Sequence, residues 1–271
     1  MGLVHFGEHR FDAKLVAFDK DGTLFDFNAS WRRTFLQAVE SLLAPLVNRT
    51  EIRAAFCRAL GFDAVAGTFN EDGPFAADTS EATIRAAATA LHKLSDPPLP
   101  WDECDRLVRR RFAPILADPV DLLPVTALAP LFSSLHENCV RVAVITSDDS
   151  GPTEAALARF RLSRFVDFIA CGDGAFPHKP APDPLLAAAK AVDVSMAETV
   201  VVGDAQADLR MARSAGAGLA VGVLTGVGSR STLGPLADLI LDSVSEIRVV
   251  VSPSGEQPPV PDHSSDRPGE P

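Results

Sequence analysis

The sequence predicts an α/β fold, in which a Rossmann-like, doubly wound parallel sheet carries an inserted α-helical domain. Two features of the chain indicate this class. Short apolar runs recur along it and alternate with stretches of helical spacing, which is the pattern of buried parallel strands joined by helices. In addition, the region from 27 to 118, soon after the first apolar run, has apolar residues at helical spacing and no strand-like run.

Six apolar runs are the expected strands. Each is four to six residues long, which fits a strand that is buried on both faces of a sheet. In chain order they are Leu15–Phe18, Arg141–Thr146, Phe165–Ala170, Thr199–Gly203, Gly218–Val223 and Asp238–Leu241.

Helices are expected between these runs. Pro182-Asp183-Pro184 precedes a helix expected from Leu185, and Gly216 ends a helix expected over roughly Ala205–Ala215. Gly61–Asp78 is expected as a loop, and loops of that length are often functional. In the region from 27 to 118, helices are expected near Ser30–Leu43, Thr50–Leu60, Ser80–Leu94 and Pro100–Phe112.

These elements divide the chain into an α/β core and a helical insert. The core is expected to comprise residues 1–26 and 119–251, and the insert residues 27–118. The last segment, 252–271, is rich in Pro, Ser and Gly with almost no large apolar side chains. Because such a composition cannot bury a core, this segment is expected to be a disordered tail.

Composition excludes several classes of protein. The net charge of −11 over 271 residues argues against a nucleic-acid binder, which needs a basic surface. The N-terminus lacks the continuous apolar region of a signal peptide, and no run approaches the ~18 apolar residues of a membrane span. The four cysteines contain no C-x-x-C pair, so reduced thiols in a cytoplasmic protein are expected.

Polar residues follow three of the expected strands and a Pro-rich turn. Sheets of this class bind ligands at the carboxyl ends of their strands, so these residues are expected to meet. Two carboxylates so close together repel unless a cation or a proton lies between them, and Mg²⁺ prefers oxygen ligands. The residues are Asp19 and Asp21, Thr146 and Ser147, Lys179, and Asp204 with Asp208.

This set suits phosphoryl transfer, because a phosphoryl group in transfer needs nearby positive charge and an aspartate can serve as nucleophile. In order, the chain shows Asp19-Lys20-Asp21-Gly22-Thr23, then Thr146, then His178-Lys179-Pro180, then Gly203-Asp204 with Asp208. In these four motifs it resembles haloacid dehalogenase (HAD) superfamily phosphatases of the phosphoglycolate-phosphatase-like kind. The resemblance covers roughly residues 14–250.

The resemblance implies a role for each motif residue. Asp19 would be the nucleophile and an Mg²⁺ ligand, and Asp21 the general acid and base, with its backbone carbonyl on the metal. Thr146, with Ser147 beside it, would bind the phosphoryl group, and Lys179 would neutralise both Asp19 and the phosphate. Asp204 would complete the metal site, with Asp208 a ligand or its support. The helical insert would be a mobile cap of the C1 type.

The implied function is Mg²⁺-dependent hydrolysis of a small phosphorylated metabolite, with phosphoglycolate as a candidate. A phosphomutase on the same core and a non-catalytic phosphate-binding regulatory module are the alternatives. Asp21 argues against a dehalogenase, which does not need a second aspartate. Arg32, Arg33 and Arg53 of the insert could bind a substrate carboxylate, or they could belong to solvated helix faces. The oligomeric state is open.

Overall fold

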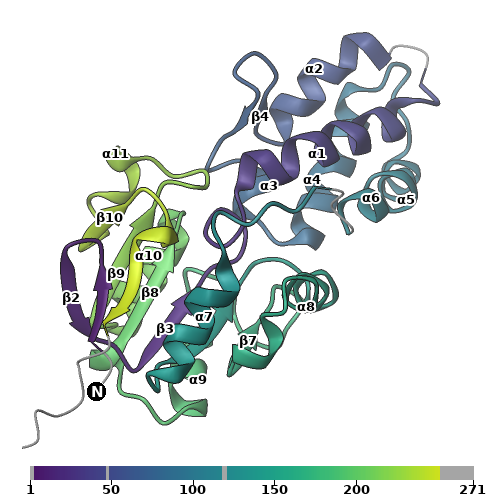
Figure 1. Cartoon of the computed structure of the whole chain (residues 1–271). Helices are drawn as coiled ribbons and strands as arrows, with labels where there is room; N and C mark the ends of the chain where they lie inside the picture. The colour runs from purple at the N-terminus through teal and green to yellow at the C-terminus, as the bar shows by residue number, and fades with distance from the viewer. Residues whose placement is uncertain (1–2, 47–48, 118–120, 251–271) are drawn as a thin grey trace, which may run out of the picture.

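A six-stranded parallel sheet forms the centre of the molecule. The structure is a computed structural model that describes residues 3–46, 49–117 and 121–250. The strand order is β10-β9-β8-β3-β6-β7, with every neighbouring pair parallel (Figure 1). The strands are β3 (Leu15–Phe18), β6 (Arg141–Ile145), β7 (Phe168–Ala170), β8 (Thr199–Gly203), β9 (Leu219–Val223) and β10 (Leu239–Leu241).

Helices cover both faces of this sheet. Successive side chains of a strand point to opposite faces, and the buried residues accordingly form two clusters. One face packs against α7 (Leu128–Glu137) and α8 (Ser150–Arg159), and the other against α9 (Asp183–Ala191) and α10 (Gln206–Ala215). The predicted doubly wound parallel sheet is therefore confirmed.

The expected strands differ from the observed ones mainly at their ends. The run from 165 to 170 yields a strand only over Phe168–Ala170, because its start is a turn of 3-10 helix, Ser163–Phe165. Helix α9 begins at Asp183, two residues before the expected Leu185. The remaining short elements are α11 (Arg230–Leu233) and turns of 3-10 helix at Met196–Glu198 and Val244–Glu246.

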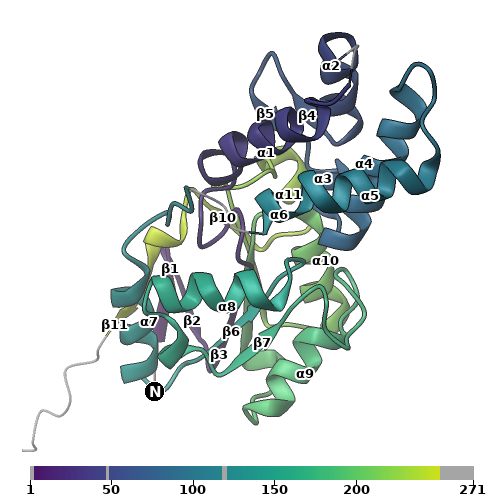
Figure 2. The same ribbon diagram turned by 90° about the vertical axis from the view of Figure 1, so that its right-hand side faces the viewer.

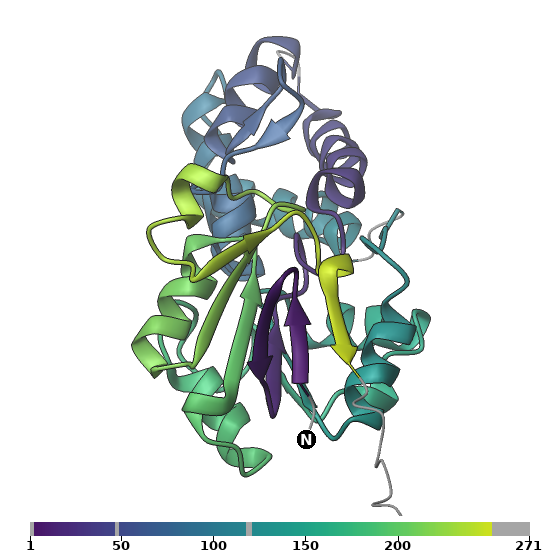
Figure 3. The ribbon, with the colours of Figure 1, turned by 60° about the vertical axis from the view of Figure 1, so that its left-hand side comes forward.

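A second, antiparallel sheet was not expected from the sequence. Its order is β11-β1-β2, with β1 (Leu3–Phe6), β2 (His9–Asp12) and β11 (Ile247–Val250) (Figure 3). Val4 and Phe6 of β1 are buried in the cluster that also contains α7, while His5 between them is only partly buried. The small sheet thus extends the hydrophobic core on one side of the large one.

The segment from Phe27 to Leu116 forms a group of helices beyond the carboxyl ends of the strands (Figures 1 and 2). These helices share a hydrophobic cluster of their own, centred on aromatic residues such as Phe35, Phe56 and Phe112. The helices are α1 (Phe27–Leu43), α2 (Arg49–Ala59), α3 (Pro74–Ala77), α4 (Ser80–Leu94), α5 (Trp101–Arg111) and α6 (Ala113–Leu116).

The stretch Gly61–Asp78 is not the plain loop that the sequence predicts. It contains the two-residue strands β4 (Phe62–Asp63) and β5 (Thr68–Phe69), which pair antiparallel, and helix α3. The rings of Phe62 and Phe69 lie 5.0 Å apart between centroids and join the aromatic cluster. Strands this short leave no periodic signal, so burial of these two rings is what defines the hairpin.

Two sequence predictions remain untested. The expected disordered tail, 252–271, lies outside the described residues. The division into a core and a cap domain stays a prediction. Among the described residues, no helix combines the length and the apolar character needed to cross a membrane.

Candidate active site

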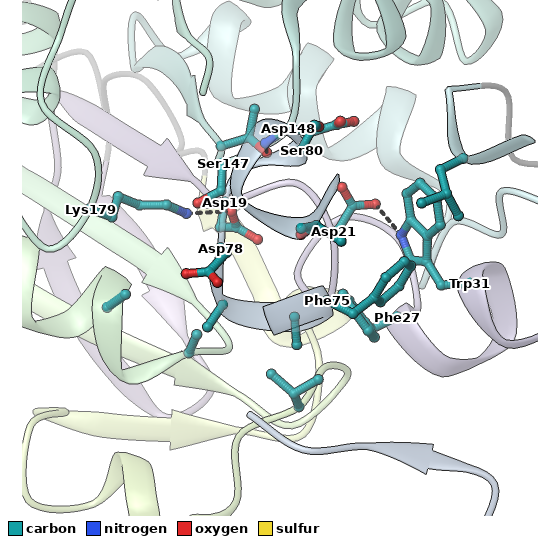
Figure 4. A pocket seen from close by; sticks show the side chains of 18 of the residues that line it. Asp19, Asp21, Phe27, Trp31, Phe75, Asp78, Ser80, Ser147, Asp148 and Lys179 are labelled. Carbon is teal, nitrogen blue, oxygen red and sulfur yellow. Dashed lines mark hydrogen bonds and ion pairs between the residues drawn. The ribbon is translucent and has the colours of Figure 1, made fainter. Parts of the chain in front are cut away.

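The carboxyl ends of the central strands bring the predicted residues to one pocket. Asp19 follows β3, Thr146 follows β6, and Asp204 follows β8, and in the sheet these three strands are adjacent. All three residues line a pocket of about 480 Å³ between the sheet and the helical segment (Figure 4). Ser147, Lys179, Asp208 and Asp21 line the same pocket. The structure therefore places every predicted site residue around a single cavity.

Lys179 links two of the carboxylates. Its Nζ donates to Asp19 Oδ1 and to Asp208 Oδ1, each at 2.6 Å, and to the carbonyl oxygen of Ile145 at 3.2 Å. Burial alone would lower the pKa of Lys179, but the Asp19 and Asp208 carboxylates raise it above its ordinary value. The ammonium group is therefore a permanent positive charge, fixed at the end of β3.

Three buried carboxylates converge beside this ammonium. One oxygen each from Asp19, Asp204 and Asp208 lie within 4.8 Å of one another. Burial raises the pKa of Asp19 to about 7, although Lys179 opposes the shift, and burial with the neighbouring carboxylates also raises the pKa of Asp204 well above its usual range. Three carboxylates against one lysine leave an excess of negative charge. A divalent cation with oxygen ligands fits this cluster.

The backbone around Asp204 leaves room for nothing larger than glycine. A Cβ on Gly22, whose φ is +93°, would lie 2.4 Å from Asp204 Cγ, and one on Gly226 would lie 1.8 Å from Asp204 Oδ2. Asp204 also accepts hydrogen bonds from Thr23 Oγ1 at 3.3 Å and from the Val227 amide at 2.9 Å. The motif glycine thus serves close approach of the chain to the carboxylate, and the orientation of Asp204 is fixed from two sides.

Asp21 points away from the three-carboxylate cluster. Its Oδ1 accepts a hydrogen bond of 2.9 Å from Trp31 Nε1 of α1 (Figure 4). Its Oδ2 is paired with Lys20. Lys20 is 1% exposed and also pairs with Asp148 at 3.0 Å. The side chains of Asp19 and Asp21 therefore face different cations, which offsets part of the repulsion that their spacing suggests.

Lys20, Trp31 and Asp148 were missed as site residues by the sequence reasoning. Lys20 offered one signal, since it is one of only five lysines and stands between the two motif aspartates. Trp31 and Asp148 had no signal of their own, because their partners come from other segments of the fold.

The insert arginines do not reach the pocket. Arg33 is paired with Asp121 at 3.1 Å and Arg53 with Glu40 at 2.6 Å, and Arg32 lies against Gly67 beside a separate groove. The idea that one of them binds a substrate carboxylate is wrong for this arrangement.

The helical segment touches the sheet domain directly at Glu71. Its two carboxylate oxygens accept hydrogen bonds from Gln206 Nε2 at 2.6 Å and from Thr232 Oγ1 at 2.7 Å. Glu71 follows the β4–β5 hairpin, while Gln206 begins α10, only two residues from Asp204. The hairpin is thus joined to the edge of the acidic cluster.

Comparison with known proteins points to one family. The model of the haloacid dehalogenase-like hydrolases matches residues 13–216. The protein CbbY from Cereibacter sphaeroides is 29% identical over 239 residues, covering 86% of this chain and 93% of that protein. A phosphoglycolate phosphatase from Chromobacterium violaceum is 28% identical over 235 residues, covering 86% and 94%. The crystal structure of CbbY from Rhodobacter sphaeroides in complex with phosphate superposes with a TM-score of 0.59 at 25% identity, covering 86% and 96%.

Proposed function

We propose that the chain hydrolyses a small phosphomonoester through an aspartyl-phosphate on Asp19. This follows from its family, because the chain belongs to the haloacid dehalogenase-like hydrolases and is a phosphatase of that family. One observation carries the proposal. Lys179 binds both Asp19 and Asp208 at 2.6 Å, beside an acidic cluster with uncompensated charge. Nucleophile, cation and metal ligands then surround one point of the pocket, as phosphoryl transfer requires.

In the first step, a carboxylate oxygen of Asp19 attacks phosphorus while the bond to the leaving alcohol breaks. Protonated Asp21 donates its proton to the alcohol oxygen. Lys179 and the hydroxyl group of Thr146 stabilise the charge on the phosphoryl oxygens. In the second step, Asp21 accepts a proton from water, the water oxygen attacks phosphorus, and inorganic phosphate leaves Asp19.

The acidic cluster would hold Mg²⁺ through the side chains of Asp19, Asp204 and Asp208, with the backbone carbonyl of Asp21 as a further ligand. When bound, Mg²⁺ would neutralise these carboxylates and polarise the phosphoryl group. The raised pKa values of Asp19 and Asp204 support this assignment, because buried carboxylates of this kind ionise at little cost only beside a cation.

We propose further that residues 27–118 act as a cap over the pocket and that the enzyme works in the cytoplasm. Relatives named phosphoglycolate phosphatase make phosphoglycolate the first metabolite to test. The CbbY structure with bound phosphate supports a phosphoryl site in the same fold.

Asp21→Asn tests the two-carboxylate mechanism. General acid–base catalysis is worth about 10²–10⁴ in rate, so steady-state hydrolysis of p-nitrophenyl phosphate with Mg²⁺ should fall by that factor. The good leaving group needs little protonation, so a burst of product should precede slow turnover while Asp19 stays phosphorylated. Rapid-quench kinetics and mass spectrometry of the Asp19 peptide measure both.

The matched variant is Asp19→Asn, which should abolish the burst and the turnover together. Near-normal steady-state turnover in Asp21→Asn would show that the proton comes from another group. Activity of the wild type that EDTA leaves untouched would contradict the metal assignment.

A further inference from the structure

The pocket has an unusual balance of charge. Among the residues that line it, all of which lie in the described part of the chain, the only basic side chain is Lys179, and there is no arginine or histidine. Nine acidic side chains face it: Asp19, Asp21, Glu71, Asp72, Asp78, Asp148, Asp149, Asp204 and Asp208. A substrate therefore enters an acidic cavity with one available cation of the protein.

Lys179 has no capacity for a second anionic group. It is buried, donates to Asp19 and Asp208, and in the proposed reaction also faces the phosphoryl group. Lys20, the nearest other lysine, is paired with Asp21 and Asp148 and does not line the cavity. A carboxylate or a second phosphate on the leaving group would thus find no further basic side chain among the residues that line the pocket.

Most of the acidic side chains are already engaged, but two are not. Glu71 binds Gln206 and Thr232, and Asp149 is hydrogen-bonded to the side chain of Ser80. Asp72 and Asp78 are exposed, and no side-chain partner of theirs lies among the described residues. Figure 4 shows Asp78 projecting among the side chains that line the pocket. These carboxylates can accept hydrogen bonds from a ligand, and they repel an anionic one.

Aromatic and aliphatic side chains form a large part of the wall on the helical side, where Ser80 and Thr83 also line the pocket. Phe75 packs edge-on against Phe27 and Trp31, with ring centroids 6.2 and 5.7 Å away, and all three rings line the cavity. Ile84 and Leu116 continue this surface. Placing an unpaired anion against such a wall is unfavourable because the anion loses its hydration, whereas apolar carbon of a ligand gains from contact with it.

We propose that the substrate is a phosphomonoester whose leaving alcohol carries no negative charge. Its carbon skeleton lies against Phe27, Phe75 and Ile84, and a donor group, a hydroxyl or an ammonium, faces Asp78. This inference rests on the proposed phosphatase function. It separates this chain from relatives named for phosphoglycolate, whose leaving group bears a carboxylate.

Three matched substrates test it. They are 2-phosphoglycolate, the amide of 2-phosphoglycolate, whose leaving alcohol is uncharged, and phosphoethanolamine. With Mg²⁺, kcat/KM for the amide and for phosphoethanolamine should each exceed that for phosphoglycolate by at least about tenfold, since one unfavourable contact of about 1.4 kcal/mol has that effect. A value for phosphoglycolate equal to or above that for the amide would overturn the inference.

Asp78→Asn locates the effect. Because Asp78 is exposed, the variant should fold, raise kcat/KM for phosphoglycolate several-fold and lower it for phosphoethanolamine. Asp102→Asn, which removes the same charge from the exposed face of α5 outside the pocket, should leave kcat/KM for both substrates unchanged. If the ratio of kcat/KM for phosphoethanolamine to that for phosphoglycolate were the same in wild type and Asp78→Asn, Asp78 would have no part in the discrimination.

Hydrolysis of p-nitrophenyl phosphate distinguishes a failure of this inference from a failure of the proposed phosphatase function. If the protein hydrolyses p-nitrophenyl phosphate but prefers phosphoglycolate to its amide, the inference about the leaving group is wrong and the proposed phosphatase function is unaffected. No hydrolysis of any of the four esters would instead overturn the proposed function.

Discussion

Trp31 connects the helical segment to the residue proposed as acid and base. Its Nε1 donates to Asp21 Oδ1 at 2.9 Å, and Lys20 is paired with the other carboxylate oxygen. Two donors on opposite oxygens leave Asp21 one orientation while both are in place. Trp31 is therefore a positioning residue whose contact exists only while α1 lies against the end of β3.

Trp31→Phe removes this donor and keeps an aromatic ring. A hydrogen bond to a charged group contributes about 1.5 kcal/mol or more, so kcat for p-nitrophenyl phosphate should fall about tenfold, with KM little changed. Phosphorylated Asp19 should persist longer than in wild type, because Asp21 then activates water less well. Trp101→Phe, at the exposed second tryptophan, is the control. Equal kcat in the two variants would deny Trp31 this role.

The pKa of Asp19, raised to about 7 mainly by burial, predicts a pH dependence of stability in the metal-free protein. Between the unfolded value near 4 and about 7, the folded state holds a proton that the unfolded state has lost, so this group reduces stability as pH rises through that window. In EDTA, the Tm of Asp19→Asn minus that of wild type should therefore be larger at pH 8 than at pH 5. A difference independent of pH would contradict the shifted pKa.

At this scale, the sequence could predict which residues meet but not how they pair. Parallel strands bring their carboxyl ends together, so residues that follow a strand or belong to a motif beside it were expected to meet. These residues are Asp19, Lys179, Asp204 and Asp208. The partners of Asp21 could not be predicted, because Lys20 faces it only through the local turn and Trp31 only through the docking of α1. Such contacts depend on side-chain direction, which a motif does not contain.

Among the elements, the β4–β5 hairpin leads directly into the contact between the helical segment and the elements beside the large sheet. Glu71, the second residue after β5, accepts hydrogen bonds from Gln206 of α10 and Thr232 of α11, so it connects the helical segment to two elements beside the large sheet. The hairpin itself is held by aromatic packing, with Phe69 and Phe75 stacked at 4.8 Å between centroids. Opening the pocket on this side requires Glu71 to release both donors.

Glu71→Gln should weaken this contact, because an amide nitrogen cannot accept a hydrogen bond. Losing about 1 kcal/mol of local stability should speed hydrogen exchange of the amides in 61–73 about fivefold. Glu51→Gln, on the exposed surface of α2, is the matched control. Unchanged exchange of the hairpin relative to this control would show that Glu71 does not hold it.

The strands of the large sheet were predictable because each is a continuous apolar run, and three of them are followed by polar site residues. The small sheet was not. β1 is only four residues long, and its burial depends on pairing with β11 at the other end of the described chain. The β4–β5 hairpin could not be predicted either, because its two-residue strands depend on the aromatic cluster that encloses them.

For the whole molecule, the proposed metal site predicts that Mg²⁺ binding stabilises the folded state. A ligand that binds only the folded state stabilises it by about 2.7 kcal/mol at one hundred times its Kd, so Mg²⁺ should raise the Tm of wild type. Asp204→Asn removes a charged ligand and should shift the Mg²⁺ concentration needed for this effect at least about tenfold upwards, with activity strongly reduced. Asp102→Asn should behave as wild type. An Asp204→Asn enzyme with the Mg²⁺ dependence of wild type would refute the metal site.

The antiparallel pairing of β1 with β11 sets Leu3 directly opposite Val250. Partners in such a pair lie about 5 Å apart between Cα atoms, so the described chain is almost a closed ring. A short linker could join these two residues, and new ends could then be opened between α1 and α2 without separating any strand from its neighbours. In such a circular permutant the sheet would keep every pairing, and the segment 27–118 would no longer be an insertion, because one of its helices would come first in the chain.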